Sequence, residues 1–129
     1  PKGIELGFTL TPHRLFKLRG AYTHLDPGDF TYQTSKNRFN ADATGYLPLG
    51  KNRVEGEIAY NFTGDGYFYD FESTPHKSFA LTNARLSFCY GDLYRLSLTV
   101  KNLMDTKYQY ALSEWQAGRT MLISIDARY

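Results

Sequence analysis

The sequence has a single cysteine, little net charge and no long apolar run, and each shortage excludes a class of protein. One cysteine in 129 residues cannot form an internal disulfide, so a disulfide-stabilised scaffold is excluded. Lys and Arg number 15 against 13 Asp and Glu, and this balance argues against a nucleic-acid partner. No run approaches the ~18 apolar residues of a membrane-spanning helix, although a membrane β-barrel needs apolar residues only at alternate positions.

Aromatic side chains, in contrast, are abundant: 11 Tyr, 9 Phe and 1 Trp make up 16% of the chain. This content excludes a disordered tail, because such tails lack large apolar side chains. The 11 glycines show no triplet period, which excludes a collagen-like chain. The first residues, Pro1 to Ile4, contain neither an initiator Met nor a signal-peptide pattern. Either a signal peptide has been removed or the chain is part of a longer protein, and we expect the second.

Seven runs of the sequence alternate apolar and polar residues with period two, which is the spacing of a strand with one apolar face. In the clearest run, Met121, Ile123 and Ile125 alternate with more polar neighbours. None of the runs has the i, i+3, i+4, i+7 spacing of an amphipathic helix. The prediction is one all-β segment over residues 1–129, with strands within 4–10, 16–22, 39–47, 54–62, 84–90, 94–100 and 121–129.

The connections between these runs alternate in length. Three are short and rich in turn residues: Thr11–Arg14, Pro48–Asn52 and Gly91–Leu93. The other three are long and contain many aromatic residues: Leu25–Asn37, Thr63–Ser78 and Leu103–Gly118. Short turns at one end and long loops at the other predict an antiparallel up-and-down meander, as in a barrel of the outer membrane.

Alternation alone leaves open which face meets hydrocarbon. Polar faces that carry both charge signs suit a water-filled lumen, and aromatic residues at the run ends suit the membrane interfaces. We expect Met121, Ile123, Ile125 and Tyr129 to face lipid, and the lumenal Arg and Lys to pair with Asp42, Glu55, Glu57 and Asp126 on neighbouring strands. The alternative is a small barrel, lipocalin-like or of the outer membrane, that binds an apolar ligand. That alternative needs an eighth strand, which the sequence does not show.

A motif near the end of the chain resembles a known family. The stretch Val100-Lys101-Asn102-Leu103-x-Asp105-x-x-Tyr108 resembles the penultimate strand and loop entry of TonB-dependent outer-membrane receptors. Lys2-Gly3-Ile4-Glu5-Leu6 looks like a common strand start of that family, and Gly118-Arg119-Thr120 with the terminal Tyr129 looks like its closing strand. Phe is more usual than Tyr at the last position.

The resemblance implies the C-terminal part of a barrel of roughly 22 strands that is closed by a plug domain. Its implied partners are outer-membrane lipid, the plug and remaining strands, the TonB energy-transducing complex and a small metal chelate, such as an iron–siderophore complex or a corrinoid. The implied location is the bacterial outer membrane. Energy would come from the inner membrane, so the resemblance implies neither catalytic residues nor a cofactor in this segment.

Two aromatic groups in the long connections are candidates for ligand contact. Exposed aromatic rings offer flat contact area at low entropic cost, which suits flat and partly hydrophobic ligands. The alternative is that these rings belong to the outer aromatic girdle of the barrel or pack one loop against another. The three histidines lack metal-ligand spacing and the acidic residues lack a calcium-loop pattern, so we expect no metal site. The candidate residues are Tyr67, Phe68, Tyr69 and Phe71 in the second long connection and Tyr110 and Trp115 in the third.

Overall fold

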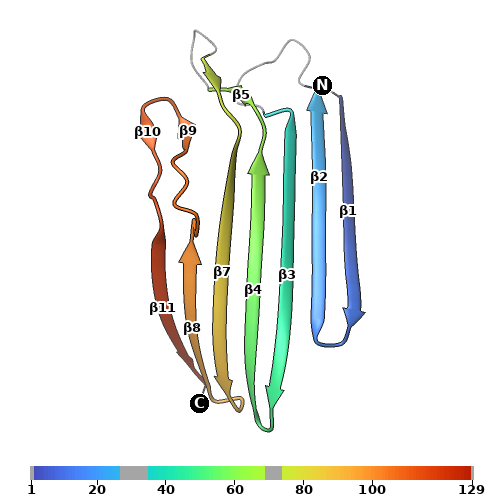
Figure 1. The fold of residues 1–129 in the computed structure, drawn as a ribbon, viewed down its shortest axis with the longest axis vertical. Coiled ribbons are helices and arrows are strands. Elements are labelled where there is room, and N and C mark those ends of the chain that lie inside the picture. Colours follow the sequence, from blue (N-terminus) through green and yellow to red (C-terminus); the bar gives the residue numbers. More distant parts are fainter. Residues whose placement is uncertain (1, 27–34, 69–73, 129) are drawn as a thin grey trace.

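The computed structural model describes residues 2–26, 35–68 and 74–128, which form one large antiparallel sheet and two small hairpins (Figure 1). Long strands that follow one another in the sequence are neighbours in the sheet, which confirms the predicted all-β meander. Among the described residues, no helix is long and apolar enough to cross a membrane. In sheet order the strands are β1 (Lys2–His13), β2 (Phe16–Asp26), β3 (Asn37–Leu49), β4 (Asn52–Thr63), β7 (Phe79–Tyr90), β8 (Tyr94–Lys101) and β11 (Thr120–Ala127).

Two of the long connections contain short strands that the sequence pattern did not predict. β5 (Gly66–Tyr67) pairs with β6 (Pro75–His76), and β9 (Gln109–Ala111) pairs with β10 (Glu114–Trp115). Both hairpins lie at the end of the sheet opposite the short turns (Figure 1). Strands of two or three residues are too short to display a period, which is why the sequence indicated only loops there.

The first short turn lies later than predicted. β1 continues through Thr11 and Pro12 to His13, with a register shift between Leu10 and His13, so the turn itself is Arg14 and Leu15. A proline is tolerated there because the register shift breaks the ladder locally. The second turn lies within its predicted range: Gly50, with a φ of 64°, and Lys51 join the paired residues Leu49 and Asn52.

The register aligns the apolar residues of all the long strands on one face. Along one row of the sheet, Ile125 lies opposite Leu96, Leu96 opposite Phe88, and Phe88 opposite Val54. This face is open: Met121, Ile123 and Ile125 are 67%, 69% and 73% exposed. Met121, Ile123 and Ile125 lie on this open face, and their contact with lipid stays a prediction; Tyr129 lies outside the described residues.

The polar face contains the buried side chains. Ser87, Cys89 and Ser97 are 2%, 4% and 6% exposed, although they lie on strands whose apolar residues are open. A soluble sandwich or lipocalin-like barrel requires the reverse arrangement, with apolar residues inside. The described sheet therefore has the inside-out pattern of a transmembrane barrel wall.

This inversion predicts the solution behaviour of the isolated 129-residue chain. In plain buffer we expect it to associate, because the apolar face far exceeds the few hundred Å² that soluble monomers expose and the edge strands β1 and β11 offer unpaired backbone groups. Size-exclusion chromatography with light scattering, with and without detergent, measures this. A sharp monomer peak in plain buffer with a cooperative melt would show that the apolar residues pack together, contrary to the fold described.

Candidate ligand-binding site

The family-like motif forms a tight turn, residues 102–108, between β8 and β9; we call it the Asn102 turn. Asn102 is 4% exposed and has a φ of 51°, a left-handed conformation that Asn tolerates better than most residues. Its side-chain Oδ1 accepts the N–H of Thr106 at 2.9 Å, and its Nδ2 donates to the carbonyl of Thr106 at 2.8 Å. Its own N–H donates to Oδ1 of Asn83 on β7 at 2.9 Å. The asparagine therefore has a structural role.

Asp105 connects the same turn to the start of β11. It also has a left-handed φ, of 55°, and its Oδ1 accepts the N–H of Arg119 at 2.7 Å. A side chain at Gly118 would collide with this carboxylate, which explains the glycine before Arg119. The N–H of Leu103 donates to the carbonyl of Thr82 at 2.7 Å. The motif residues thus fasten β7, β8 and β11 together, and only Tyr129 of the motif lies outside the described residues.

Aromatic rings cluster above the ends of β7 and β9. Phe79 lies 5.0 Å from Tyr108 and 5.6 Å from Tyr110, measured between ring centroids, and the two tyrosines lie 5.2 Å apart. His76 joins this cluster through Phe79 and through Phe68. Burial, and to a lesser extent the neighbouring Tyr110, raise the pKa of the Tyr108 phenol. The partial burial of Tyr108 therefore disfavours its phenolate form.

A hollow of about 390 Å³ opens on the polar face beside this cluster. We call it the amide hollow, because Asn40, Asn61, Asn83 and Gln109 line it. Its wall is formed by β3, β4 and β7, where Asn40 lies opposite Asn61 and Asn61 opposite Leu81. The remaining lining residues are Ser35, Arg38, Phe62, Thr63, Tyr67, His76, Phe79, Leu81 and Tyr110.

The structure separates the predicted ligand-contact residues. Tyr67 and Tyr110 both line the amide hollow. Phe68 is 6% exposed and packs against His76 at a centroid distance of 5.3 Å, whereas Trp115 is 68% exposed and is not part of the lining. Tyr69 and Phe71 lie outside the described residues.

Sequence reasoning missed the amides of the hollow. The sequence signal that could have found these amides is their position. Asn40, Asn61 and Asn83 each lie on the polar face of a strand, within a few residues of a long connection. Ser35, which is 5% exposed and lies 3.3 Å from Nε2 of His76, carries no sequence signal.

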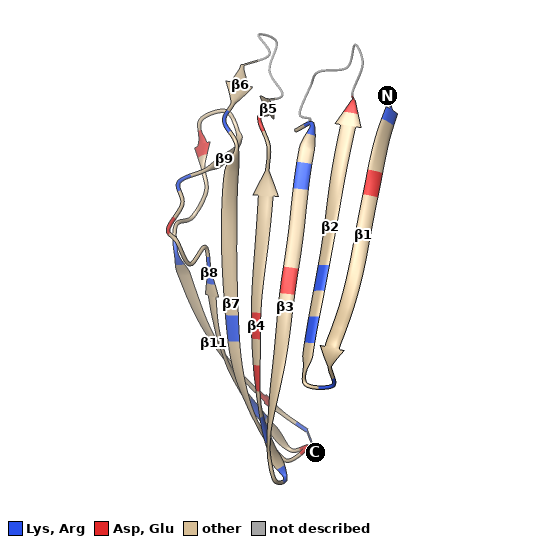
Figure 2. Cartoon of the chain, turned by 45° about the vertical axis from the view of Figure 1, so that its right-hand side comes forward, with Lys and Arg blue, Asp and Glu red and all other residues tan. Residues whose placement is uncertain are grey.

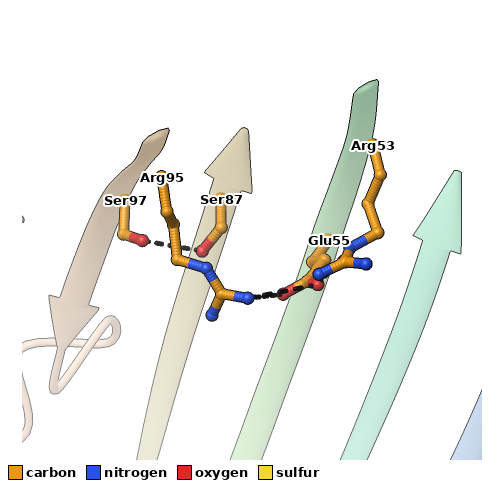
Figure 3. Close-up of polar contacts among 5 residues, drawn as sticks. All are labelled: Arg53, Glu55, Ser87, Arg95 and Ser97. Carbon is orange, nitrogen blue, oxygen red and sulfur yellow. Dashed lines mark hydrogen bonds and ion pairs between the residues drawn. The ribbon is translucent and has the colours of Figure 1, made fainter. Parts of the chain in front are cut away.

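Nearer the short turns, the polar face carries paired charges (Figure 2). Glu55 on β4 contacts Arg53 on its own strand and Arg95 on β8, the latter at 3.4 Å (Figure 3). Arg95 reaches across β7 because small residues lie beneath it there, with Ser87 bonded to Ser97 at 2.9 Å. We call Arg53, Glu55 and Arg95 the Glu55 cluster.

The predicted pairing of charges on adjacent strands is confirmed only for Asp42, which binds Arg19 across the β2–β3 ladder at 2.9 Å. Glu55 bonds within its own strand and across an intervening one, and Glu57 and Asp126 form no ion pair with another described residue. Metal ligands are also absent as a group: the described ranges hold no cluster of three or more His, Cys, Asp or Glu that could bind a metal ion.

An antiparallel meander with an open apolar face, a polar face that buries its side chains, and long connections at one end defines the wall of a transmembrane β-barrel. A family model for the β-barrel of TonB dependent receptor-like proteins matches residues 2–103. The chain belongs to that family.

Among solved structures, the chain is similar to one in the structure of the FpvAI-pyocin S2 complex, with a TM-score of 0.71 and 15% sequence identity. The match covers 95% of this chain and 18% of that chain, so this chain spans less than a fifth of the length of its structural neighbour. At this identity the likeness shows the fold alone. No curated protein sequence matches the chain.

The hydrogen bonds of Asn102 predict the effect of replacing it with glycine. Asn102→Gly keeps the left-handed backbone accessible but leaves the part-buried N–H and carbonyl of Thr106 without these partners, at up to about 1–3 kcal/mol each. In the full-length protein, purified in detergent, we expect trypsin to cleave after Lys107 at least about tenfold faster. Met104→Ala is the control, because Met104 is 72% exposed. Equal cleavage rates would show that the side chain of Asn102 does not hold the turn.

The raised pKa of Tyr108 predicts a late-titrating phenol. A phenol with a raised pKa in the folded state stabilises the fold fully below its ordinary pKa of about 10, and this contribution is lost as pH rises through the higher folded value. Ultraviolet titration of phenolate in the folded protein should show a late component that Tyr108→Phe removes and Tyr90→Phe retains. If the late component remained in Tyr108→Phe, the burial of this ring would be contradicted.

Proposed function

We propose that the chain forms part of the wall of an outer-membrane receptor that takes up a small metal chelate, such as an iron–siderophore complex or a corrinoid, with energy supplied through TonB. Membership of the TonB dependent receptor-like barrel family supports the class. The single observation that carries the proposal is the division of the sheet into a continuous apolar face and an opposite face that holds the amide hollow. The first face suits lipid, and the second suits a polar ligand in a lumen.

The orientation follows from the connections. Barrels of this type have short turns on the periplasmic side and longer loops outside the cell. The turns at Arg14, Gly50 and Gly91 are therefore placed in the periplasm, and the β5–β6 and β9–β10 hairpins outside. This arrangement places the amide hollow at the entrance of the lumen, where an external ligand arrives first.

The proposal includes further strands and a plug domain. β1 and β11 each have one neighbour within the described sheet, and an unpaired strand edge in hydrocarbon costs several kcal/mol for each unsatisfied backbone group. Additional strands remove both edges by closing the barrel. The plug would close the lumen and connect it to TonB, so no catalytic residue is required in this segment.

Uptake and membrane insertion test the proposal together. Cells that produce the full-length protein should accumulate an iron or cobalt chelate only when TonB is functional, measured with radiolabelled metal. Ile123→Arg should greatly reduce the amount of protein in the outer membrane, because a cation at the lipid-facing midplane costs about 2–4 kcal/mol.

Ser124→Arg is the matched control, since Ser124 is the next residue of β11 and lies on the polar face. We expect it to insert at the level of the unchanged protein. Equal insertion of both variants would contradict the lipid-facing assignment, and chelate uptake that persists without TonB would contradict the mechanism of transport.

A further inference from the structure

The amide hollow is large enough to hold a small molecule. Its volume of about 390 Å³ lies within the usual range of roughly 300–1,000 Å³ for ligand pockets. Strands β3, β4 and β7 form its wall, and the β5–β6 and β9–β10 hairpins contribute Tyr67, His76, Gln109 and Tyr110 at its rim. Figure 1 shows both hairpins beside the end of β7.

The polar groups of this hollow are available to a ligand. The side chains of Asn40, Asn61 and Gln109 form no hydrogen bond with another described residue, and Asn83 uses only its Oδ1, for the Asn102 turn. The polar face near the short turns differs, because Glu55 pairs there with both Arg53 and Arg95. Amides without protein partners supply N–H donors and carbonyl acceptors in one place.

The charge of the hollow selects among ligands. Arg38 is the one formally charged side chain among its described lining residues, which include no carboxylate. A multiply anionic ligand would lose more hydration than a single guanidinium can replace, and a cationic ligand would find no counter-charge. Neutral or singly anionic ligands that are rich in carbonyl groups match both the amides and Arg38, while Tyr67, Phe79 and Tyr110 offer apolar contact.

Metal chelates differ in their net charge and in the oxygen atoms that they present. A ferric complex of three hydroxamate groups is neutral, because each group loses a single proton, and it presents carbonyl oxygens. A ferric complex of three catecholates is strongly anionic, because each catechol loses two protons. We propose that the amide hollow binds neutral or singly anionic chelates of the hydroxamate type in preference to tris-catecholates. This inference rests on the function proposed above and specifies its substrate class.

Equilibrium dialysis of the full-length protein in detergent tests the preference. The probes are iron(III) complexes of a cyclic tris-hydroxamate, a linear tris-hydroxamate and a tris-catecholate, each with radiolabelled iron. We expect at least one hydroxamate complex to bind about tenfold or more tightly than the catecholate complex. Tighter binding of the catecholate, or no binding of any hydroxamate, would overturn the inference.

Variants locate the binding within the hollow. Asn61→Leu removes both the donor and the acceptor, and Asn61→Asp keeps the shape but replaces the donor with a negative charge. Both should weaken hydroxamate binding about tenfold. Thr9→Leu is the control, because Thr9 is an exposed residue on the polar face of β1 and is not part of the lining. Unchanged affinity in both Asn61 variants would place the ligand elsewhere.

TonB-dependent uptake by the same protein separates the two proposals. Uptake of a catecholate or a corrinoid, without hydroxamate binding, would retain the transporter and overturn the ligand class. Absence of TonB-dependent uptake for every chelate, despite normal insertion in the outer membrane, would instead overturn the function itself.

Discussion

Antiparallel backbone pairing is the constraint on which the rest of this structure depends. Hydrocarbon offers no hydrogen-bond partner, so every strand must satisfy its backbone groups on its neighbours. Because side chains alternate along a strand, the register that pairs the backbone also decides which residues share a face. A shift of one residue in β11 would move Ile123 and Ile125 to the polar face and place Ser124 and Asp126 in their position. The register and the apolar face therefore support each other.

The same register divides the polar face into two zones. In the zone near the short turns, small residues on β7 let Arg95 reach Glu55 across an intervening strand, and Glu55 pairs there with both Arg95 and Arg53. In the zone near the long connections, Asn40 and Asn61 lie side by side without such partners. The first zone pairs some of its charged groups within the sheet, whereas under the proposed function the amides of the second are left for a ligand. This contrast would let the hollow be selective without being strongly charged.

The sequence predicted the features that depend on neighbouring residues and missed those that depend on residues far apart in the chain. Period two identifies the strands and their faces, because each residue's side is decided by its immediate neighbours. The motif at Asn102 marked its turn, since a left-handed backbone and a bonded asparagine involve residues only four apart. Arg95 and Glu55 are 40 residues apart, and their contact depends on the size of the residues between them on β7. The amide hollow combines residues from four separate segments, so no window of sequence contains it.

The Asn102 turn holds residues of the wall and rim of the amide hollow in place. Asn83 lines the hollow and accepts the N–H of Asn102, and Tyr108, in the same turn, packs on Phe79 and Tyr110 at the rim. Ligand groups held by such bonded neighbours keep their geometry better than groups on a free loop. The residues that would choose the ligand in the proposed receptor, Arg38, Asn40 and Asn61, lie on the opposite face from the open apolar residues and take no part in the turn. Under the proposed function, changes in ligand preference would therefore arise at these positions while both the apolar face and the support of the site are retained.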